Sequence, residues 1–354
     1  MKRILHLIES LTTGGAENLL CNTIAELPEY DHLIVTVFEG NNLSMVPPNA
    51  KHVCLGARSK TDVFFKLTAY TKTLKEYRPN IVHAHLYFAT ILAKAGTPAS
   101  IPLLFTQHFE FSKNATKWYY RFIDRILSKK AQTCLAVSNV VLNDYVSTTG
   151  FNGKKNVLGI YIPDHYFTLD RSKVEPQNGH LKLLALGNIK AIKNQQYLLD
   201  AFALLKDLPV SCDVYGEGME RTRLEKEARA KGINVFFKGP VADSRGILSH
   251  YHLFIMPSLT EGSPLSLFEA MAAGLPPIVS DIPVFHELLG EETNFIPLNH
   301  AAALRKILED YLQHPNKIDT EGAKAKALAA TKVSKNVYLE KIRGVYNASI
   351  ASKF

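Results

Sequence analysis

The stretch that decides the fold is residues 252–281, HLFIMPSLTEGSPLSLFEAMAAGLPPIVSD. It begins with a continuously apolar run, HLFIMPS, which is typical of a strand buried on both faces of a parallel sheet. Ser263 and Pro264 predict a helix with the serine as N-cap and the proline as first residue, and Gly274 predicts its end. PPIVSD then predicts a second strand, which completes a strand–helix–strand unit.

The same alternation of apolar strands and amphipathic helices runs through all 354 residues. Such units, joined by right-handed crossovers, build doubly wound parallel sheets of the α/β class. The predicted strands of the first half are RILHLIE, HLIVTVF, HVCLG, NIVHAHL, PLLFTQH, TCLAVS and NVLGIYI. Those of the second half are LKLLALGN, SCDVYGEG, NVFFKG, HLFIMPS, PPIVSD and NFIPL.

The alternation restarts near the middle of the chain, which predicts two domains. Residues 166–180 are polar and contain Pro176 and Gly179, so they are expected to form a linker between domains at 1–165 and 181–333. Residues 334–354 predict a C-terminal amphipathic helix that could pack back on the first domain. Two Rossmann-like domains of this kind are expected to face each other across a cleft, with ligands at the carboxyl ends of the strands.

Composition narrows the classes of partner. A net charge of +8 favours anionic partners such as nucleotides, phosphates or a lipid surface, and no helix-turn-helix or RNA-binding signature supports nucleic acid. The four cysteines form no C-x-x-C pair and no disulfide framework. Neither a signal peptide nor an apolar run of membrane-spanning length is recognisable. The sequence therefore predicts a cytoplasmic protein.

Two glutamates flank the predicted helix start in the first stretch. Glu261 is expected in the loop and Glu269 on the second turn, while the backbone N–H groups of Leu265 and Ser266 are free at the helix start. A helix start favours an anion. A phosphate there, with carboxylates accepting hydrogen bonds from sugar hydroxyls, suits a ligand that carries both groups. The alternative is that both acids are solvated residues of an ordinary helix terminus.

Four motifs together resemble one enzyme family. They are E-G-S-P-L-S-L-F-E at 261–269, T-G-G-A-E at 13–17, Y-G-E-G-M-E-R at 215–221 and V-F-F-K-G-P-V at 235–241. The first resembles the E-x7-E signature of the retaining, GT-B-fold glycosyltransferases of family 4, whose second domain is termed glycosyl transferases group 1. The resemblance implies transfer of a hexosyl-type sugar from a nucleoside-diphosphate donor, with UDP the commoner nucleotide, to an acceptor hydroxyl with retention of anomeric configuration.

The resemblance also implies which acceptor receives the sugar and that the reaction needs no cofactor or metal. The acceptor is expected to be a glycan or a lipid-linked glycan of the cell envelope, made in polysaccharide biosynthesis. No cofactor and no metal are expected. Retention without a clear nucleophile implies attack on the same face of the sugar within an ion pair, and closure of the two domains would exclude water.

Site residues in the second half follow from the same resemblance. Glu261 corresponds to the family's acid near the transferred sugar, Glu269 to the acid that binds ribose, and Val241 and Asp243 to positions that hold the base. Pro264, Leu265 and Ser266 belong to the helix start that receives the diphosphate. These residues constitute most of the predicted donor site.

Two further loops complete the predicted donor site. Gly14 and Gly15 follow the first strand and allow close approach of the backbone to a phosphate, or form a simple turn. Lys193 follows the first strand of the second domain, where its charge can neutralise the departing diphosphate, or it is a surface lysine. The family usually has an arginine five residues before this lysine. Asn188 stands there instead and removes one positive charge from the expected phosphate clamp.

Histidines of the first half are candidates for the acceptor side. His108 ends a predicted strand, and its counterpart in the family faces the acceptor and the transferred sugar; the alternative is a structural histidine. His83 and His85 alternate on one strand and so share a face. Such a pair can be half of a metal site, but no third ligand follows at a tight spacing, so no metal is predicted.

A basic helix is predicted from Lys113 to Lys129. It places Lys117, Arg121 and Arg125 on one side and Trp118 among its apolar residues. One interpretation is an ordinary helix with a solvated side and a core side. The other is a surface that contacts anionic lipid or a lipid-linked acceptor on the inner face of the cell membrane.

Two other functions are compatible with the sequence. One is a nucleotide-sugar hydrolase or epimerase of the same fold, which would turn the donor over without an acceptor. The other is a nucleotide-sugar-binding module without catalysis. Glu261, Glu269 and Lys193 are all present, which argues against a module that has lost its activity.

Overall fold

The computed structural model describes residues 1–12, 14–114, 118–128, 133–170, 179–241 and 243–351. The chain forms two compact units. The first comprises Met1–Ile160 and Asn336–Phe354, and the second comprises Tyr161–Lys335. Residues 171–178 of the predicted linker lie outside the described residues, and the predicted domain boundaries stay a prediction.

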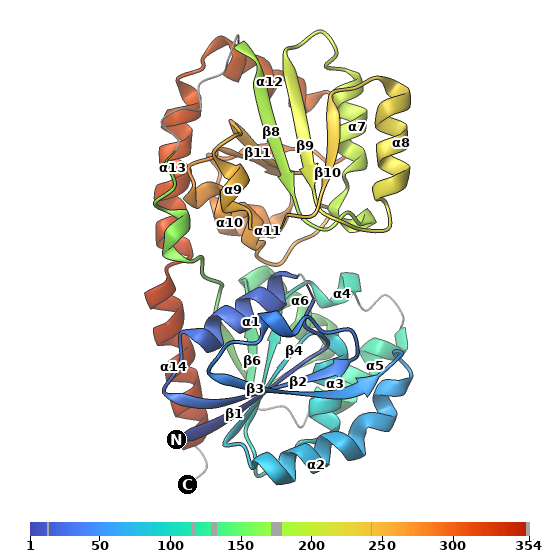
Figure 1. Ribbon diagram of the computed structural model, residues 1–354, viewed down its shortest axis with the longest axis vertical. Helices are drawn as coiled ribbons and strands as arrows, with labels where there is room; N and C mark the ends of the chain where they lie inside the picture. Colours follow the sequence, from blue (N-terminus) through green and yellow to red (C-terminus); the bar gives the residue numbers. More distant parts are fainter. Residues whose placement is uncertain (13, 115–117, 129–132, 171–178, 242, 352–354) are drawn as a thin grey trace. The chain divides into compact units, whose positions relative to one another are not determined.

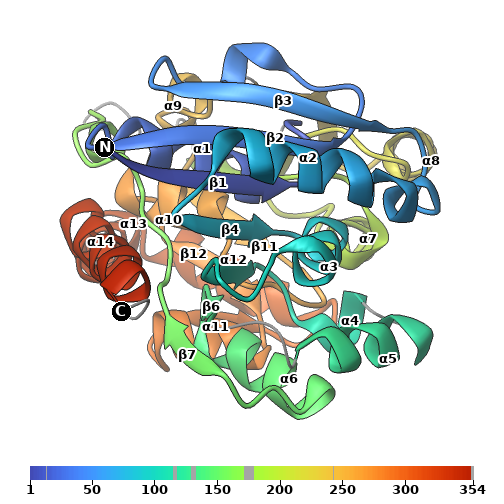
Figure 2. The same cartoon turned by 90° about the horizontal axis from the view of Figure 1, so that it is seen from below.

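The first unit is built on a parallel sheet of seven strands in the order β3-β2-β1-β4-β5-β6-β7 (Figures 1 and 2). Continuously apolar sequences form these strands because helices cover both faces of the sheet. The strands are β1 Lys2–Ile8, β2 Tyr30–Phe38, β3 Ala50–Ala57, β4 Ile81–His85, β5 Leu103–Gln107, β6 Thr133–Ala136 and β7 Lys154–Val157. Six of the seven strands predicted for the first half are confirmed, whereas the predicted NVLGIYI coincides with β7 only at Asn156 and Val157 and residues 158–162 are not in a strand.

The two faces of this sheet are covered by different helices. The helices are α1 Gly15–Ala25, α2 Leu67–Tyr77, α3 Tyr87–Gly96, α4 Phe111–Asn114, α5 Trp118–Leu127, α6 Asn139–Thr149 and α14 Lys335–Ala351. One face packs Leu5 and Val82 with Tyr70 of α2, Leu92 of α3 and Tyr145 of α6 in a continuous apolar core. The other face carries several histidines and lies against α14.

The C-terminal helix α14 packs on the first unit, as the sequence allowed. The Tyr346 hydroxyl lies 2.8 Å from Nδ1 of His83, and the Arg343 guanidinium donates to Glu29 at 2.6 Å. Tyr338 meets Thr23 of α1 at 3.3 Å. The chain therefore returns to its first unit to cover the histidine face.

The second unit repeats the architecture with six parallel strands in the order β10-β9-β8-β11-β12-β13. The strands are β8 Leu181–Leu186, β9 Val210–Tyr215, β10 Val235–Gly239, β11 Leu253–Met256, β12 Pro277–Ser280 and β13 Asn294–Ile296. The helices are α7 Gln196–Ala203, α8 Arg221–Lys231, α9 Arg245–Leu248, α10 Leu265–Ala272, α11 Pro283–Leu289, α12 Ala303–Gln313 and α13 Lys317–Lys332. All six strands predicted for the second half are confirmed.

Each sheet has one point at which its winding reverses. In the first sheet the chain builds outward from β1 through β2 to β3 and then returns to place β4 on the other side of β1. In the second sheet β11 lies on the other side of β8 from β9 in the same way. The loops at the carboxyl ends of the two central strands part at such a point, and ligands of α/β proteins bind in the crevice that results.

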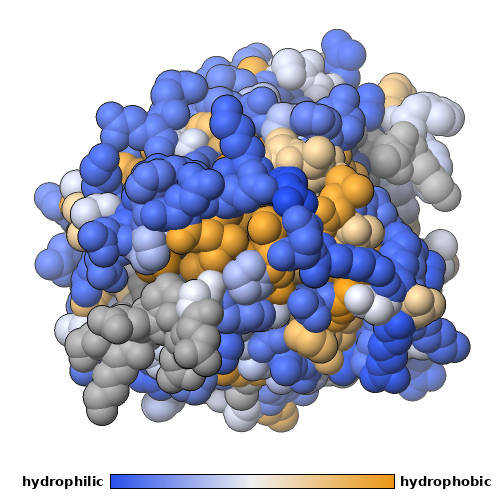
Figure 3. All heavy atoms as spheres, turned by 90° about the horizontal axis from the view of Figure 1, so that it is seen from above, coloured by the Kyte–Doolittle hydropathy of each residue, from blue (hydrophilic) through white to orange (hydrophobic). Residues whose placement is uncertain are grey.

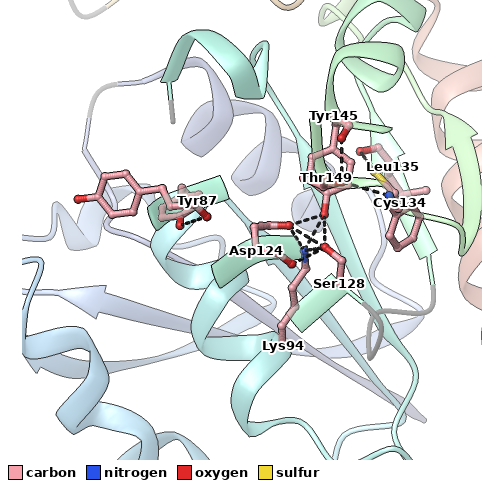
Figure 4. A network of polar contacts seen from close by, with 10 residues as sticks. Tyr87, Lys94, Asp124, Ser128, Cys134, Leu135, Tyr145 and Thr149 are labelled. Atoms are coloured by element: carbon pink, nitrogen blue, oxygen red, sulfur yellow. Dashed lines mark hydrogen bonds and ion pairs between the residues drawn. The ribbon is translucent and has the colours of Figure 1, made fainter. Parts of the chain in front are cut away.

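Helix α5 buries an acid, Asp124, and exposes several apolar residues. Asp124 is buried and accepts from the Lys94 ammonium of α3 at 2.9 Å, which also meets Ser128 and the Tyr145 hydroxyl at 3.2 and 2.7 Å (Figure 4). Trp118 and Phe122 are 75% and 55% exposed. Burial of an unpaired charge is costly, so Lys94 and Asp124 hold each other in the interior and fix which side of α5 faces solvent.

The outer surface is mainly hydrophilic in the view from the end at which α12 lies, with an apolar area at its centre (Figure 3). Apolar atoms contribute more than half of a typical folded surface, so this area alone identifies no partner. Among the described residues, no helix is both long enough and apolar enough to cross a membrane. All four cysteines are free.

Candidate functional site

The loop that follows β8 is shaped by two glycines of the Y-G-E-G motif. The backbone N–H of Gly187 donates to the carbonyl of Tyr215 at 3.0 Å, and that of Ile189 donates to Glu217 at 2.8 Å. A Cβ atom on Gly216 or Gly218 would lie 1.9 or 2.0 Å from the carbonyl oxygen of Gly187 or Ile189. Only glycine allows this approach, so the motif fixes the path of the loop toward Lys193.

Lys193 and Glu261 form an ion pair across the β8/β11 reversal. The Lys193 Nζ lies 2.6 Å from Oε1 of Glu261, whose side chain is only 2% exposed, whereas that of Lys193 is 23% exposed. A backbone hydrogen bond of 2.9 Å from Leu259 to the carbonyl of Ile192 joins the same two loops. The structure therefore brings together the two residues predicted to stabilise the leaving group and to bind the transferred sugar.

The predicted helix start at Pro264 is shifted by one residue. Pro264 has extended dihedrals, φ −74° and ψ 123°, and is itself the N-cap of α10, so Leu265 is the first helical residue. The prediction of Ser263 as N-cap is therefore wrong; no side chain caps this helix. Ser266 instead donates from its hydroxyl to the carbonyl of Leu186 at the end of β8, 3.0 Å away. This bond holds the start of α10 against the carboxyl end of the central strand.

Glu269 is held by two residues that the sequence analysis missed. Its Oε2 accepts from the Ser244 hydroxyl at 2.8 Å, and Ser244 lies 2.9 Å from the hydroxyl of Tyr166. Burial raises the pKa of the Glu269 carboxyl, and the hydrogen bonds from Ser244 and Tyr166 partly offset that effect. Ser244 could have been found in the sequence because it follows Asp243, which is predicted to bind the base. Nothing in the sequence indicated Tyr166.

The remaining donor-site candidates lie in loops of the second unit. Asn188 is exposed in the β8 loop, and its carbonyl accepts from Gln195 at 3.1 Å. Val241 is partly buried after β10. Asp243 is exposed and paired with Arg245, whose guanidinium lowers the pKa of the aspartate. Their roles toward a nucleotide stay predictions.

In the first unit, Gly14 and Gly15 lie at the start of α1. Gly14 is the N-cap with φ −140°, which any residue can adopt, and Gly15 begins the helix. A Cβ on Gly14 would lie 2.2 Å from a carboxylate oxygen of Glu17, so a larger residue there would displace the Glu17 side chain. Glu17 also accepts from Thr12 at 3.3 Å.

His108 and His85 belong to a buried cluster of histidines on one face of the first sheet. The Nδ1 atom of His85 lies 3.3 Å from Nε2 of His108. His6 of β1 pairs in register with His83 of β4, and its Nε2 lies 3.0 Å from Nδ1 of His32. Burial lowers the pKa of His108 to about 4, holds those of His6, His83 and His85 well below 6.5, and lowers that of His32. The cluster is therefore neutral at pH 7.

The tautomers of His32 and His6 follow from one backbone carbonyl. Nε2 of His32 lies 2.8 Å from the carbonyl oxygen of Leu27, which can only accept, so this nitrogen carries the proton. Nδ1 of His32 then accepts from His6, which leaves Nδ1 of His6 as a buried lone pair with no partner. Nε2 of His85 is likewise buried without a partner.

Sheet pairing adds a third histidine to the H-x-H pair. One ring nitrogen from each of His6, His83 and His85 lies within 4.8 Å of the others. The sequence contained no sign of this, because His6 comes from a strand that is distant along the chain. Both nitrogens of His83 already meet partners, the hydroxyls of Tyr346 and Thr106, each at 2.8 Å. The absence of a catalytic metal stays a prediction.

A pocket of about 280 Å³ lies at the carboxyl ends of β1, β4 and β5 in the first unit. Glu9 accepts there from the backbone N–H of Phe88 at 2.8 Å, and burial raises the pKa of its carboxyl. Leu86 has φ 67° and ψ 166°, a conformation that costs a non-glycine residue about 1–3 kcal/mol. The lining is Glu9, Lys60, Leu86, Tyr87, Phe88, Thr106, Gln107, His108, Phe109, Phe111 and Tyr120. Of these, only His108 was predicted.

The predicted basic helix is described as two helices, α4 and α5. Lys117 lies outside the described residues. Arg121 and Arg125 are exposed on α5, and the Arg121 guanidinium donates to the carbonyl of Ser112 at 2.9 Å. Trp118 is the most exposed aromatic residue of α5.

Comparison with known proteins identifies the class. Residues 13–158 match the model of "Glycosyltransferase Family 4" and residues 167–327 match "Glycosyl transferases group 1". The chain belongs to the GT-B glycosyltransferases, in which these two domains follow one another.

Similar proteins and structures agree with that assignment. The chain is 24% identical to the "Putative glycosyltransferase EpsF" of Bacillus subtilis (strain 168) over 79% of each chain. It is also 24% identical to the O-antigen chain mannosyltransferase RfbU of Salmonella typhimurium (strain LT2) over 57% of each. Anabaena HepE in complex with UDP and glucose has the same fold, with a TM-score of 0.84, 18% identity and coverage of 98% of this chain and 100% of that one.

Removal of one partner of the Lys193–Glu261 pair is expected to destabilise the second unit. Lys193→Met leaves a buried carboxylate unpaired and should cost about 3 kcal/mol of unfolding free energy. The double variant Lys193→Met, Glu261→Gln should regain most of the lost stability, because no charge is left unpaired. It should not regain sugar transfer. Denaturant unfolding and transfer rates measure the two effects, with the exposed Lys182→Met as control. Equal losses of stability in the single and double variants would contradict the pairing.

Acid is expected to destabilise the first unit through the histidine cluster. Imidazoles in the unfolded chain have a pKa of about 6.5, so below that pH they take up protons that the buried ones cannot. The contribution of the buried histidines to the free energy of unfolding is therefore fully present above pH 6.5. It falls toward pH 4 by about 1.4 kcal/mol per pH unit for each histidine. The titratable groups packed there also include His32, Tyr30, Tyr338 and Tyr346, with Glu29 and Asp31 near His32.

Amide hydrogen exchange of β1 and β4 between pH 7.5 and 4.5 measures this effect. His6→Leu should make the free energy of unfolding depend less steeply on pH, because the contribution of one histidine is removed. The exposed His250→Gln is the control and should leave it unchanged. Protection that stays constant down to pH 4.5 would show that the histidines titrate normally in the folded state.

Proposed function

We propose that this glycosyltransferase moves a hexosyl sugar from a UDP-sugar to a hydroxyl of a cell-envelope glycan, with retention of anomeric configuration and without a metal or other cofactor. The observation that carries the proposal is the convergence of Lys193, Glu261, Ser266 and Glu269 at the β8/β11 reversal. HepE, which shares the fold, binds UDP and glucose, and RfbU is named for O-antigen synthesis.

The departing diphosphate would be stabilised by the protein's own groups. The backbone N–H groups of Leu265 and Ser266 have no intrahelical partner at the start of α10, and a helix start favours negative charge. Lys193 adds a cation that is already held by Glu261. A preorganised cation beside N–H donors stabilises charge that develops as the glycosidic bond breaks. Asn188 contributes a hydrogen-bonding side chain in place of the family's arginine.

The two carboxylates would bind different parts of the donor. Glu269 accepts from Ser244 through one oxygen, and the remaining lone pairs can accept from ribose hydroxyls. Glu261 is buried and would contact the transferred sugar beside Lys193. Val241 and Asp243 would lie beside the base, and the Gly14–Gly15 turn beside the diphosphate and sugar. His108 and His85 would belong to the acceptor side.

The proposed reaction is tested with a panel of UDP-sugars and a lipid-linked glycan extract. Proton NMR of the product should give the same anomeric configuration as the donor, and added chelator should leave the rate unchanged. Glu269→Ala should weaken UDP binding by roughly tenfold or more in calorimetry, because a charged hydrogen-bond acceptor is lost. The exposed Glu292→Ala is the matched control. Donor cleavage that is independent of any acceptor would favour a hydrolase instead.

Helix α5 supports contact with the inner face of the cell membrane. Trp118, Phe122 and Ile126 follow one another at four-residue spacing and are 75%, 55% and 53% exposed. Exposed Arg121 and Arg125 lie on the same helix. Buried Asp124 holds its own side of α5 against the rest of the unit, so the aromatic residues on the opposite side face outward. Apolar residues beside cations suit an interface with anionic lipid, where a lipid-linked acceptor would be found.

Vesicle flotation tests this contact. Trp118→Ser with Phe122→Ser should abolish binding to vesicles that contain phosphatidylglycerol, and Arg121→Glu with Arg125→Glu should do the same. Phe236→Ser, which removes an aromatic residue that is 47% exposed in the second unit, is the matched control and should bind normally. Binding that persists in both α5 variants would refute the proposed surface.

A further inference from the structure

The hydroxyl groups of Tyr166 and Ser244 lie beside Glu269 but are not themselves contacts of the donor in the proposed function. We propose that Tyr166 and Ser244 are positioning residues, which fix the Glu269 carboxylate so that it accepts from two adjacent hydroxyls of a ribose. The site thereby discriminates against a 2′-deoxyribonucleotide donor. The inference rests on the proposed function, because it requires a nucleotide whose ribose binds Glu269.

Three elements that are distant along the chain meet at the Glu269 side chain. Glu269 lies in α10, Ser244 precedes α9, and Tyr166 ends the 3-10 turn η4 (Asp164–Tyr166), which packs against α10. The Ser244 hydroxyl donates to Oε2 of Glu269 at 2.8 Å, and the Tyr166 hydroxyl lies 2.9 Å from Oγ of Ser244. The three side chains therefore form one continuous network.

The direction of these hydrogen bonds follows from the protons that are available. A serine hydroxyl carries a single proton, and an ionised carboxylate can only accept. Since Ser244 gives its proton to Glu269, it can only accept from Tyr166. Burial raises the pKa of the Tyr166 hydroxyl, so the phenol keeps the proton that it donates. Both hydroxyls are thus directed toward the carboxylate, and each bond polarises the next.

Ser244 does not have the usual role of a serine at its position. It is the N-cap of α9, where a serine oxygen normally accepts from a backbone N–H of the first turn and stabilises the helix. No side chain caps α9, and the Ser244 oxygen meets the Tyr166 hydroxyl instead. The hydroxyl is therefore used to hold Glu269 and not to stabilise its own helix.

The network has a buried end and an accessible end. Tyr166 and Ser244 are only 8% and 7% exposed, whereas Glu269 is partly buried. A carboxylate has about four lone-pair positions, so the bond from Ser244 leaves acceptors for a ligand. A carboxylate that is held by buried donors and is itself accessible can accept from a ligand in one fixed orientation.

Fixing this carboxylate affects recognition because its last torsion angle is soft. The χ3 angle of glutamate has broad, roughly two-fold preferences, so a side chain that is not held could turn to whichever hydroxyl is present. The 2′ and 3′ hydroxyls of ribose are adjacent and can both donate to one carboxylate. A carboxylate that is held and loses one of these donors keeps an unsatisfied acceptor, which weakens binding.

A merely structural role for Tyr166 and Ser244 predicts a different result. Removal of either hydroxyl would then lower the thermal midpoint but leave the preference for ribose unchanged. If both residues act through Glu269, their removal should have no further effect on this preference once Glu269 has been replaced. A double-mutant cycle with Glu269→Gln distinguishes the two cases.

Calorimetry with UDP and 2′-deoxy-UDP provides the test. Wild-type protein should bind UDP about tenfold or more tightly than 2′-deoxy-UDP, because a hydrogen bond to a charged group is lost. Tyr166→Phe and Ser244→Ala should each reduce this ratio about threefold or more. Ser244→Thr keeps the hydroxyl and should retain the ratio. Tyr251→Phe is the matched control, since it removes another buried phenol hydroxyl that donates to a carboxylate, that of Asp213 at 2.7 Å.

Three results would overturn the inference. They are similar affinities of wild type for UDP and 2′-deoxy-UDP, a wild-type ratio in either Tyr166→Phe or Ser244→Ala, and an equal effect of Tyr166→Phe with and without Glu269→Gln. Each of them can occur while wild-type protein binds UDP, so the proposed donor site would stand. Absence of UDP binding in wild type, or unchanged UDP affinity in Glu269→Ala, would instead refute the proposed donor site itself.

Discussion

A carboxylate stands at the point where each sheet reverses its winding, buried in the case of Glu261 and partly buried in the case of Glu9, and each is held by a partner. Glu261 is 2% exposed and is held by the Lys193 ammonium, and Glu9 is held by the first turn of α3. Because an unpaired charge in the interior is strongly unfavourable, these partners determine the loops around both crevices. In the second unit the loop reaches Lys193 only because Gly216 and Gly218 allow close backbone approach.

Buried polar groups also determine which surfaces face outward in the first unit. The Lys94–Asp124 pair holds the Asp124 side of α5 inward and leaves Trp118 and Phe122 exposed. On the opposite face of the sheet, neutral histidines take the place of an apolar core and are covered by α14. The same unit therefore has buried histidines of lowered pKa on one face and exposed aromatic side chains on the other.

The sequence predicted most strands well, because buried parallel strands are continuously apolar. It also predicted that Lys193 and Glu261 belong to one site, and the structure places their side chains 2.6 Å apart. It missed contacts between segments that are distant along the chain, such as His6 beside His83 and Tyr166 near Glu269. Glu9 was missed because a single acid after a strand has no local signature, and its burial arises from α3 packing above it. The cap of α10 shifted by one residue because Ser263 makes no capping bond.

The central claim is that a diphosphate binds at the start of α10 beside Lys193. The most direct measurement is a crystal structure of the protein with a UDP-sugar. The account predicts phosphate oxygens about 3 Å from the backbone nitrogens of Leu265 and Ser266 and from the Lys193 ammonium, with ribose hydroxyls on Glu269. A nucleotide bound elsewhere, with the Lys193–Glu261 pair unchanged and the start of α10 without a phosphate, would contradict it.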